Sequence, residues 1–321
     1  MKGWQFTTTH APLQLVEKED PKASGNRVVI DVKAAGLCHS DVSGLTDENW
    51  LDTIMINYPI IMGHEVAGII TEIGEDVTDF KVGDRVALCP VALDGSGFGP
   101  GFAYDGGFGT KVCCPAEDLV LIPENVSFAQ AAAATDAGMT SYHALFGTGG
   151  AKAGMKVGII GVGGLGQIAA RAAIVEGCDV YVADLSPAAR ELAEAIGIKP
   201  SQIFEDASHF AALNLPLIID YAGFGVTTAT AVDVVAPGGR VVLVGMGKGY
   251  TEINTTSLIL KKVQLHGSVV GSKADIEGVL KLMSSGDLNP LLVPITFEEI
   301  PEGLKKLENN EVKGRLVAVR D

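Results

Sequence analysis

The chain has 321 residues, of which 47% are hydrophobic and only 6% aromatic, and its formal net charge is -15. This length predicts two domains with room for a large core. The acidity disfavours polyanionic partners such as nucleic acid or an anionic membrane surface, and no apolar run has the length of a membrane span.

Five cysteines are present, with neither an even framework nor a paired C-x-x-C motif: Cys38, Cys89, Cys113, Cys114 and Cys178. This spacing argues against a disulfide scaffold. The first residues, 1–5, lack the apolar core of a secretory signal peptide. We therefore expect a cytoplasmic protein.

Short β-rich runs separated by turn signals fill roughly the first 125 residues. Residues 27–33, 66–74 and 85–88 are expected strands, and glycine-containing turns lie between them. Many short strands at this spacing favour a partly closed β-barrel over βαβ units.

An alanine-rich helical stretch over residues 128–146 leads into a region where apolar strands alternate with helices. The expected strands there are 156–160, 179–183, 215–220, 240–245 and 263–270, and the expected helices include 187–196 and 227–235. This alternation predicts an α/β domain with a doubly wound parallel sheet. The tail predicts helices over 276–283 and 300–307, and a final strand, 314–319, that rejoins the first domain.

A glycine-rich turn between the expected strand at 156–160 and the helix after it carries the G-x-G-x-x-G spacing at Gly161, Gly163 and Gly166. The three glycines serve a tight turn, close backbone approach to a pyrophosphate, and close helix–strand packing. Such a turn also occurs for structural reasons alone. Here the next strand ends about twenty residues on at Asp184, which can accept hydrogen bonds from an adenosine ribose, so the sequence predicts dinucleotide binding.

Two compact polar groups stand out in the first domain, Gly-Leu-Cys-His-Ser-Asp over residues 36–41 and Gly-His-Glu over residues 63–65. Thiolate and neutral imidazole are suitable zinc ligands, so Cys38 and His64 are candidates, with Asp136 as a third. Each also has a plain structural interpretation: Cys38 as a small buried hydrophobe, His64 as a core histidine, Asp136 as a helix cap. Three protein ligands from separated segments would leave one coordination position open, as a catalytic zinc requires.

The order G-x-C-H-S-D, G-H-E-x-x-G, G-D-R-V, x-D-A-G-x-T and G-x-G-G-x-G resembles that of the zinc-dependent medium-chain dehydrogenase/reductase family, and of its alcohol dehydrogenases in particular. The resemblance extends over nearly the whole chain. It implies a GroES-like β-barrel catalytic domain, residues 1–137 and 271–321, with an inserted Rossmann domain, residues 138–270.

The same resemblance implies roles for individual residues. Cys38, His64 and Asp136 would bind one catalytic zinc, with Glu65 beside it in the metal group. Ser40 would contact the alcohol and begin a proton relay, Asp41 would steady His64, and His39 would approach the cofactor pyrophosphate. The cofactor-binding set would be His39, Gly161, Gly163, Gly164, Leu165, Gly166, Asp184, Leu185, Arg190, Val244 and Gly245.

Three departures from the family pattern matter. The third metal position is Asp136 rather than cysteine, a variant similar to the microbial secondary alcohol dehydrogenases. Residues 91–104 contain no cysteine, so no structural zinc lobe is expected. Ser43 stands where a relay histidine is often found, so the proton is expected to leave through Ser40, the cofactor ribose and water.

The resulting prediction is a zinc-dependent oxidoreductase that moves hydride between NAD(H) and an alcohol, aldehyde or ketone, with secondary alcohols slightly favoured. Asp184 favours NAD over NADP, although Arg190 could rotate to receive a 2′-phosphate. The alternatives are a zinc-free quinone or enoyl reductase and a non-catalytic redox sensor. The resemblance also implies a homodimer or homotetramer. A sheet edge in the nucleotide domain, near Val269 and Val270, could pair across a two-fold axis. Candidate residues to line the substrate site, each of which could equally be an ordinary packing residue, are Trp50, Leu51, Pro90, Phe98, Phe102 and Tyr104.

Overall fold

A computed structural model describes residues 1–49, 57–92, 97 and 99–321. The chain forms two compact units. The first contains residues 1–136, 272–284 and 292–321, and the second contains residues 137–271 and 285–291. Trp50, Leu51 and Phe98 lie outside the described residues. Within the described part of the chain, no helix is both long and apolar enough to cross a bilayer.

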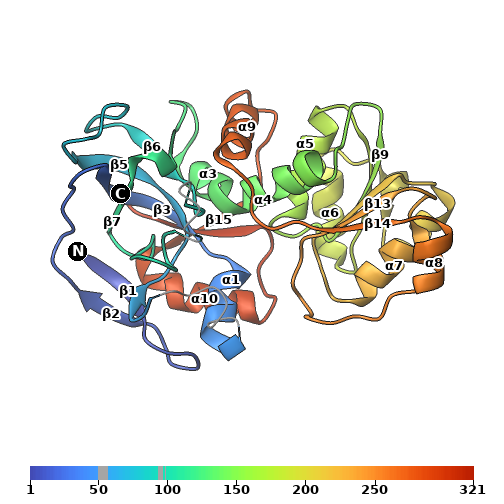
Figure 1. Ribbon diagram of the computed structural model, residues 1–321, viewed down its shortest axis with the longest axis horizontal. Helices are drawn as coiled ribbons and strands as arrows, with labels where there is room; N and C mark the ends of the chain where they lie inside the picture. The colour runs from blue at the N-terminus through green and yellow to red at the C-terminus, as the bar shows by residue number, and fades with distance from the viewer. Residues whose placement is uncertain (50–56, 93–96, 98) are drawn as a thin grey trace. The chain divides into compact units, whose positions relative to one another are not determined.

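The first unit is built on β-sheets, as Figure 1 shows for β3, β5, β6 and β7. A seven-stranded sheet has the order β15-β16-β3-β5-β6-β8, with β7 paired to β3, and a three-stranded sheet has the order β2-β1-β4. The strands are β1 (Lys2–Phe6), β2 (Gln14–Glu17), β3 (Arg27–Gly36), β4 (Ile60–Ile61), β5 (Glu65–Ile73), β6 (Arg85–Leu88), β7 (Lys111–Pro115), β8 (Leu119–Leu121), β15 (Leu292–Thr296) and β16 (Arg315–Val319). The helices are α1 (His39–Thr46), α3 (Phe128–Ala133), α9 (Lys273–Ser284) and α10 (Ile300–Glu308).

The long strand β3 organises this unit because β5, β7 and β16 all pair with it antiparallel. Its side chains are mostly buried, among them Val28, Ile30 and Val32. These β-branched residues pack well on a pleated surface covered on both faces. They join a core that also holds Phe6 and Phe108.

The second unit is a six-stranded parallel sheet with the order β11-β10-β9-β12-β13-β14. Its strands are β9 (Lys156–Ile160), β10 (Asp179–Ala183), β11 (Ile203–Phe204), β12 (Leu217–Asp220), β13 (Arg240–Leu243) and β14 (Gln264–Gly267). Its helices are α4 (Met139–Tyr142), α5 (Gly166–Val175), α6 (Pro187–Ala195), α7 (Val226–Val234) and α8 (Thr255–Leu260). The direction of strand succession reverses at β9, which makes its carboxyl end the usual place for a ligand.

The structure confirms the predicted fold class, a β-barrel-type domain together with a doubly wound parallel sheet. The final strand, β16, pairs with β3 and so rejoins the first unit, as the sequence predicts. The predicted continuous helix at 128–146 is instead interrupted. After α3 the chain forms a π-helical turn, Ala134–Gly138, then α4, then a second π-helical stretch, His143–Thr148.

Candidate metal centre and cofactor site

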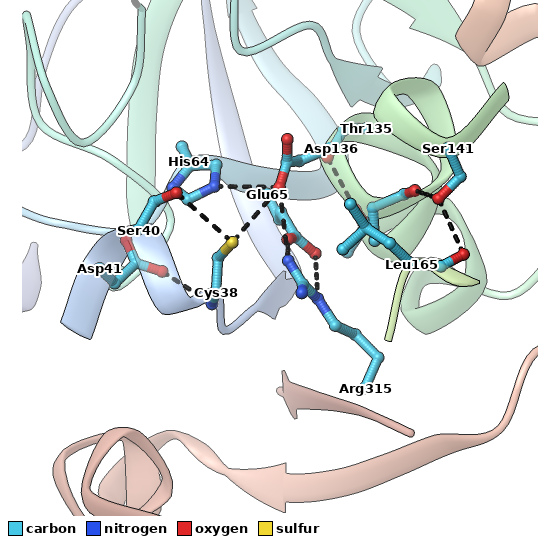
Figure 2. A network of polar contacts seen from close by, with 12 residues as sticks. Cys38, Ser40, Asp41, His64, Glu65, Thr135, Asp136, Ser141, Leu165 and Arg315 are labelled. Atoms are coloured by element: carbon cyan, nitrogen blue, oxygen red, sulfur yellow. Dashed lines mark hydrogen bonds and ion pairs between the residues drawn. The ribbon is translucent and has the colours of Figure 1, made fainter. Parts of the chain in front are cut away.

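Four side chains from separated segments of the first unit converge on one point (Figure 2). They are Cys38, His64, Glu65 and Asp136, and each offers a ligand atom within 4.8 Å of the others. Cys38 stands between β3 and α1, His64 directly precedes β5, Glu65 is the first residue of β5, and Asp136 lies in the π-helical turn. Such π-turns occur frequently at functional sites. Among the described residues this is the group whose chemistry suits a metal ion.

Asp136 is at the centre of the group. Its Oδ2 lies 3.5 Å from Cys38 Sγ, 3.4 Å from His64 Nε2 and 3.4 Å from Arg315 Nη2. A helix cap, the alternative for this residue, would not bring its carboxylate against a thiol and an imidazole. The contacts therefore favour the ligand interpretation of Asp136.

The imidazole of His64 contacts Asp41 and Phe102, which lie outside the group of potential ligands. Its Nδ1 lies 3.2 Å from Asp41 Oδ1, and its ring stacks on Phe102 with the centroids 5.0 Å apart. A carboxylate beside Nδ1 can accept its hydrogen, so when the ring is neutral, as metal binding requires, the lone pair of Nε2 faces Cys38 and Asp136. Asp41 also accepts the Cys38 backbone N–H at 2.9 Å, so one buried carboxylate orients both neighbours.

Glu65 is fully buried and pairs with a buried arginine that the sequence motifs did not reveal. Arg315 Nε donates to Glu65 Oε2 at 3.3 Å, and Arg315 Nη2 forms an ion pair with Glu65 Oε1. Arg315 is the first residue of the last strand, 250 positions along the chain from Glu65. Its one sequence signal is a charge at the start of an otherwise apolar strand, which is costly to bury without a partner.

The charges within this group shift the pKa values of Cys38 and His64. Burial alone would raise the pKa of the Cys38 thiol, but the Arg315 guanidinium, helped by His64, lowers that pKa below its ordinary value. Burial would lower the pKa of His64, yet the carboxylates of Asp41 and Asp136 raise it well above the usual range.

The donor set fits zinc. A thiolate, an imidazole and carboxylates are the ligands that zinc takes in proteins. Formally, Cys38 as thiolate with Asp41, Glu65 and Asp136 supplies more negative charge than the Arg315 guanidinium and a protonated His64 together balance. A divalent cation at this point would reduce that imbalance, which is the ordinary condition for burying so many acids together.

Ser40 and His39 lie beside the group at the start of α1. Ser40 Oγ is 3.7 Å from Cys38 Sγ and is partly exposed, so its hydroxyl can reach a small molecule at the metal position. Desolvation of the His39 ring and the nearby Arg315 charge lower the pKa of His39.

In the second unit the glycine turn joins β9 to α5. Gly161 has a φ of 87°, a backbone conformation that favours glycine. A methyl group on Gly166 would lie 1.8 Å from the Gly161 carbonyl oxygen, whereas one on Gly163 would meet no atom within 4 Å. Gly161 is thus required for its backbone conformation and Gly166 for close packing, whereas Gly163 borders open space. Gly164 and Leu165 complete it before α5 begins.

The acid predicted to bind the ribose lies directly after β10, against this turn. Asp184 Oδ2 accepts the Val162 N–H at 2.7 Å, and its Oδ1 accepts the Ser186 N–H at 2.8 Å. Arg190 on α6 donates to the carbonyl oxygens of Asp184 and Leu185, at 2.7 and 2.9 Å. Leu185 is 73% exposed beside them. Asp184 thereby stands at the carboxyl end of a strand, next to the glycine turn.

Val244 and Gly245 follow β13 at the same edge of the sheet. The loop after β12 lies next to them, and it is held by a buried acid that the sequence analysis did not single out. Asp220, fully buried at the end of β12, accepts the N–H groups of Ala222 and Gly223 at 3.0 and 2.9 Å. It also accepts the hydroxyls of Thr227 and Thr228 at 2.7 and 2.8 Å. A methyl group on Gly223 would lie 1.8 Å from the Gly245 carbonyl oxygen, so the two loops are closely packed.

The residues proposed to line a substrate site differ in how close they lie to the metal group. Phe102 is buried against His64, next to the metal group. The ring of Tyr104 instead lies under the guanidinium of Arg27, 5.2 Å from its centroid, and packs against the core of the first unit. Trp50, Leu51 and Phe98 lie outside the described residues.

Two family models match the chain. One described as an alcohol dehydrogenase GroES-like domain matches residues 24–124, and one described as a zinc-binding dehydrogenase matches residues 164–285. An alcohol dehydrogenase from Geobacillus stearothermophilus is 32% identical over 334 residues, covering 95% of this chain and 96% of that protein.

Solved structures share the complete architecture. The alcohol dehydrogenase from the hyperthermophilic archaeon Aeropyrum pernix has a TM-score of 0.88 at 26% identity, with all of both chains covered. An acetophenone reductase from Geotrichum candidum NBRC 4597, solved in complex with NAD, has a TM-score of 0.87 at 26% identity, covering 99% of this chain and 97% of that one. From the matched family models and the likeness to these proteins over nearly its whole length, this chain belongs to the zinc-type medium-chain dehydrogenase/reductase family.

Proposed function

We propose that this protein is a zinc-dependent alcohol dehydrogenase that transfers hydride between NAD(H) and an alcohol, aldehyde or ketone. The observation that carries the proposal is the convergence of Cys38, His64, Glu65 and Asp136 within 4.8 Å, in a chain whose second unit has a dinucleotide-type sheet. Cys38, His64 and Asp136 would hold the metal, with Glu65 beside it. When bound, zinc supplies Lewis acidity, which lowers the pKa of an alcohol and stabilises negative charge on a carbonyl oxygen.

The chain's own residues orient the reactants and move the proton. Asp41, whose Oδ1 lies 3.2 Å from His64 Nδ1, would hold the imidazole of His64 in the tautomer that leaves Nε2 free to bind. Ser40 Oγ, 3.7 Å from Cys38 Sγ, would accept the proton of the alcohol and pass it toward solvent. His39, whose pKa is lowered, would face the cofactor pyrophosphate as a neutral hydrogen-bond donor.

The cofactor is proposed to be NAD. The glycine turn would receive the pyrophosphate at the start of α5, and Asp184 would accept hydrogen bonds from the ribose hydroxyls. A carboxylate at this position repels a 2′-phosphate. Arg190, the residue that would have to receive that phosphate, already donates to two backbone carbonyls. Initial rates with NAD and NADP test this directly, and a clear NADP preference would overturn the cofactor assignment.

Within this substrate class, secondary alcohols and the matching ketones are proposed to be slightly favoured, because Asp136 replaces the cysteine usual at the third metal position. One of the similar solved proteins, the Geotrichum enzyme, is an acetophenone reductase, which acts on a ketone.

The experiment that tests the function combines elemental analysis with an absorbance assay for NADH on a panel of primary and secondary alcohols and ketones. We expect about one zinc per chain and alcohol-dependent NADH formation. Cys38→Ser or His64→Ala should lose bound zinc and turnover together. Full turnover in a metal-free variant would support a zinc-free reductase instead, and tight NADH binding without zinc or turnover would support a redox sensor.

A homodimer is proposed on the edge strand β14. Its four residues are all exposed, and α8 beside it carries exposed Ile259 and Leu260. Gln264 N–H and Ser268 N–H donate back to residues 239 and 243, so the alternate residues Leu265 and Gly267 direct their backbone groups to the open edge. An uncovered strand edge is a template for pairing with a second copy, and a dimer of dimers would give the tetramer.

A further inference from the structure

The hydroxyl of Ser141 contacts both the helical stretch that carries Asp136 and the glycine turn. Its Oγ lies 2.9 Å from the carbonyl oxygen of Leu165 and 2.5 Å from that of Ala137 (Figure 2). Ser141 is fully buried on α4, Ala137 directly follows Asp136, and Leu165 is the last residue of the glycine turn before α5. Ala137, Ser141 and Leu165 all belong to the second unit. One buried side chain therefore joins two segments that the function uses for different purposes.

The Ser141 hydroxyl has one hydrogen to donate, so the two carbonyl oxygens compete for it. Donated to Ala137, four residues earlier, the hydrogen bond stays within the helical stretch, which is a common bond of serines in helices. Donated to Leu165, the bond ties this stretch to the turn that opens α5. The hydroxyl thus has two arrangements, and the position of the Leu165 carbonyl biases the choice between them.

The backbone of Ser141 is held by a second residue, Tyr221, in the loop after β12. The Tyr221 hydroxyl donates to the Ser141 carbonyl oxygen at 2.9 Å, and the Tyr221 N–H bonds with the carbonyl of Ile160 at the end of β9. Burial raises the pKa of Tyr221, so its hydroxyl stays protonated and remains a donor. Ser141 is thereby tied to the carboxyl edge of the parallel sheet, where a dinucleotide binds in this kind of fold.

The same helical stretch carries a member of the metal group. Asp136 lies in the π-helical turn Ala134–Gly138, which also contains Ala137, and its carboxylate is 3.4 Å from His64 Nε2. A π-helical turn replaces the regular α-helical bonds with i→i+5 bonds. A side-chain donor to one of its carbonyls, as Ser141 is to Ala137, therefore helps to fix the local backbone that presents Asp136.

We propose that Ser141 is a positioning residue that couples the glycine turn to the turn carrying Asp136, so that bound NADH and bound zinc strengthen each other's binding. The inference rests on the proposed function, since it takes Asp136 as a zinc ligand and the glycine turn as the cofactor site. Cofactor bound at the turn would fix the Leu165 carbonyl, and with it Ser141 and the backbone that leads to Asp136. Because a coupling between two ligands is reciprocal, zinc would tighten NADH binding by the same factor.

Zinc affinity with and without NADH tests this coupling without relying on turnover. The zinc-loaded protein is titrated with a chelator, once alone and once with saturating NADH. In the wild type we expect NADH to tighten zinc binding about fivefold or more, and in Ser141→Ala we expect that factor to fall to about twofold or less. A merely structural role of Ser141 would weaken zinc binding equally with and without NADH and leave the factor unchanged.

Thr135→Val is the matched control. The Thr135 hydroxyl is also fully buried, and it donates to a carbonyl of the same helical stretch, that of Ala132, at 2.7 Å. Its loss should leave the NADH-dependent factor at the wild-type value, whatever it does to zinc affinity itself. Any direct attraction between cofactor and metal is the same in both variants, so a difference between them reports the Ser141 hydroxyl.

A factor in Ser141→Ala equal to that of the wild type, or an equal fall in Thr135→Val, would overturn the inference and leave the proposed function intact. A wild-type protein that binds zinc and NADH without any coupling would do the same. If Ser141→Ala fails to fold, Tyr221→Phe decides, because it releases the backbone of Ser141. A lowered factor in Tyr221→Phe supports the inference, and the wild-type factor contradicts it. A wild-type protein that binds no zinc or no NADH would end the proposed function as well.

Discussion

At the scale of single residues, Asp41 shows how the metal group depends on a side chain outside it. It contacts His64 Nδ1 through one oxygen and the Cys38 N–H through the other, and it is fully buried. We expect Asp41→Asn to weaken zinc binding by about 10–100-fold, since the amide cannot accept on both sides. Chelator competition measures this. Asp47→Asn, at the exposed end of the same helix, is the control. Equal zinc affinity in both variants would show that Asp41 does not orient the ligands.

Residue types and spacing predicted part of this site. Residue chemistry singled out Cys38 and His64, with Asp136 as a third candidate, and the family resemblance added Glu65. Arg315 could not be found this way, because its partner is 250 residues away and the contact depends on strand register. Asp220 was missed for a related reason, since its role is to satisfy backbone N–H groups of a loop whose path only the fold defines.

At the scale of elements, two glycines of the turn between β9 and α5 have different expected roles, Gly166 in packing and Gly163 in cofactor binding. Gly166→Ala places a methyl group against the Gly161 carbonyl, so we expect a loss of about 1–3 kcal/mol in the free energy of unfolding. Gly163→Ala meets no atom of the chain, so its stability should match the wild type.

The same open space at Gly163 is where the backbone would approach the pyrophosphate. We therefore expect Gly163→Ala to weaken NADH binding about tenfold or more, equivalent to about 1.4 kcal/mol, without a change in melting temperature. Thermal unfolding and NADH fluorescence titration measure the two effects. Unchanged NADH affinity in Gly163→Ala would argue against a pyrophosphate at this turn.

The periodicity of apolar residues made most helices and strands predictable. The helical stretch at 128–146 is a case where it did not predict the local structure. Its alanine-rich composition supports helix formation, but composition carries no signal for the π-helical turns that interrupt it. The turn at Ala134–Gly138 carries Asp136, so the local irregularity is part of how this carboxylate is placed in the metal group. There Asp136 contacts Cys38, His64 and Arg315, which are far from it in the sequence.

At the scale of the whole molecule, three separated stretches of chain build the first unit. The alternation of strands and helices predicted the parallel sheet, and the last strand was expected to rejoin the first domain, which its pairing with β3 confirms. Nothing in the sequence pattern indicated that the chain returns to the second unit after residue 284. Residues 285–291 belong to the second unit, where Leu291 bonds with the side chain of Gln167 and Asp287 accepts from Arg171.

The proposed assembly makes a further prediction at this scale. Leu265→Lys puts a charge on the open edge of β14, a substitution that natural sheets use to prevent edge pairing. We expect the molar mass from light scattering to fall from that of the wild-type oligomer toward a smaller species. Val82→Lys, which changes an exposed valine in the first unit, should leave the mass unchanged. A monomeric wild-type protein would contradict the proposed dimer.

The account depends on one thiolate, one imidazole and one carboxylate meeting at a single zinc ion, and zinc-edge X-ray absorption of the purified protein tests this most directly. We predict one sulfur scatterer at about 2.3 Å and nitrogen or oxygen scatterers at about 2.0–2.2 Å. A zinc ion surrounded only by nitrogen and oxygen, or one with several sulfur neighbours, would contradict the assignment of Cys38, His64 and Asp136 as its ligands.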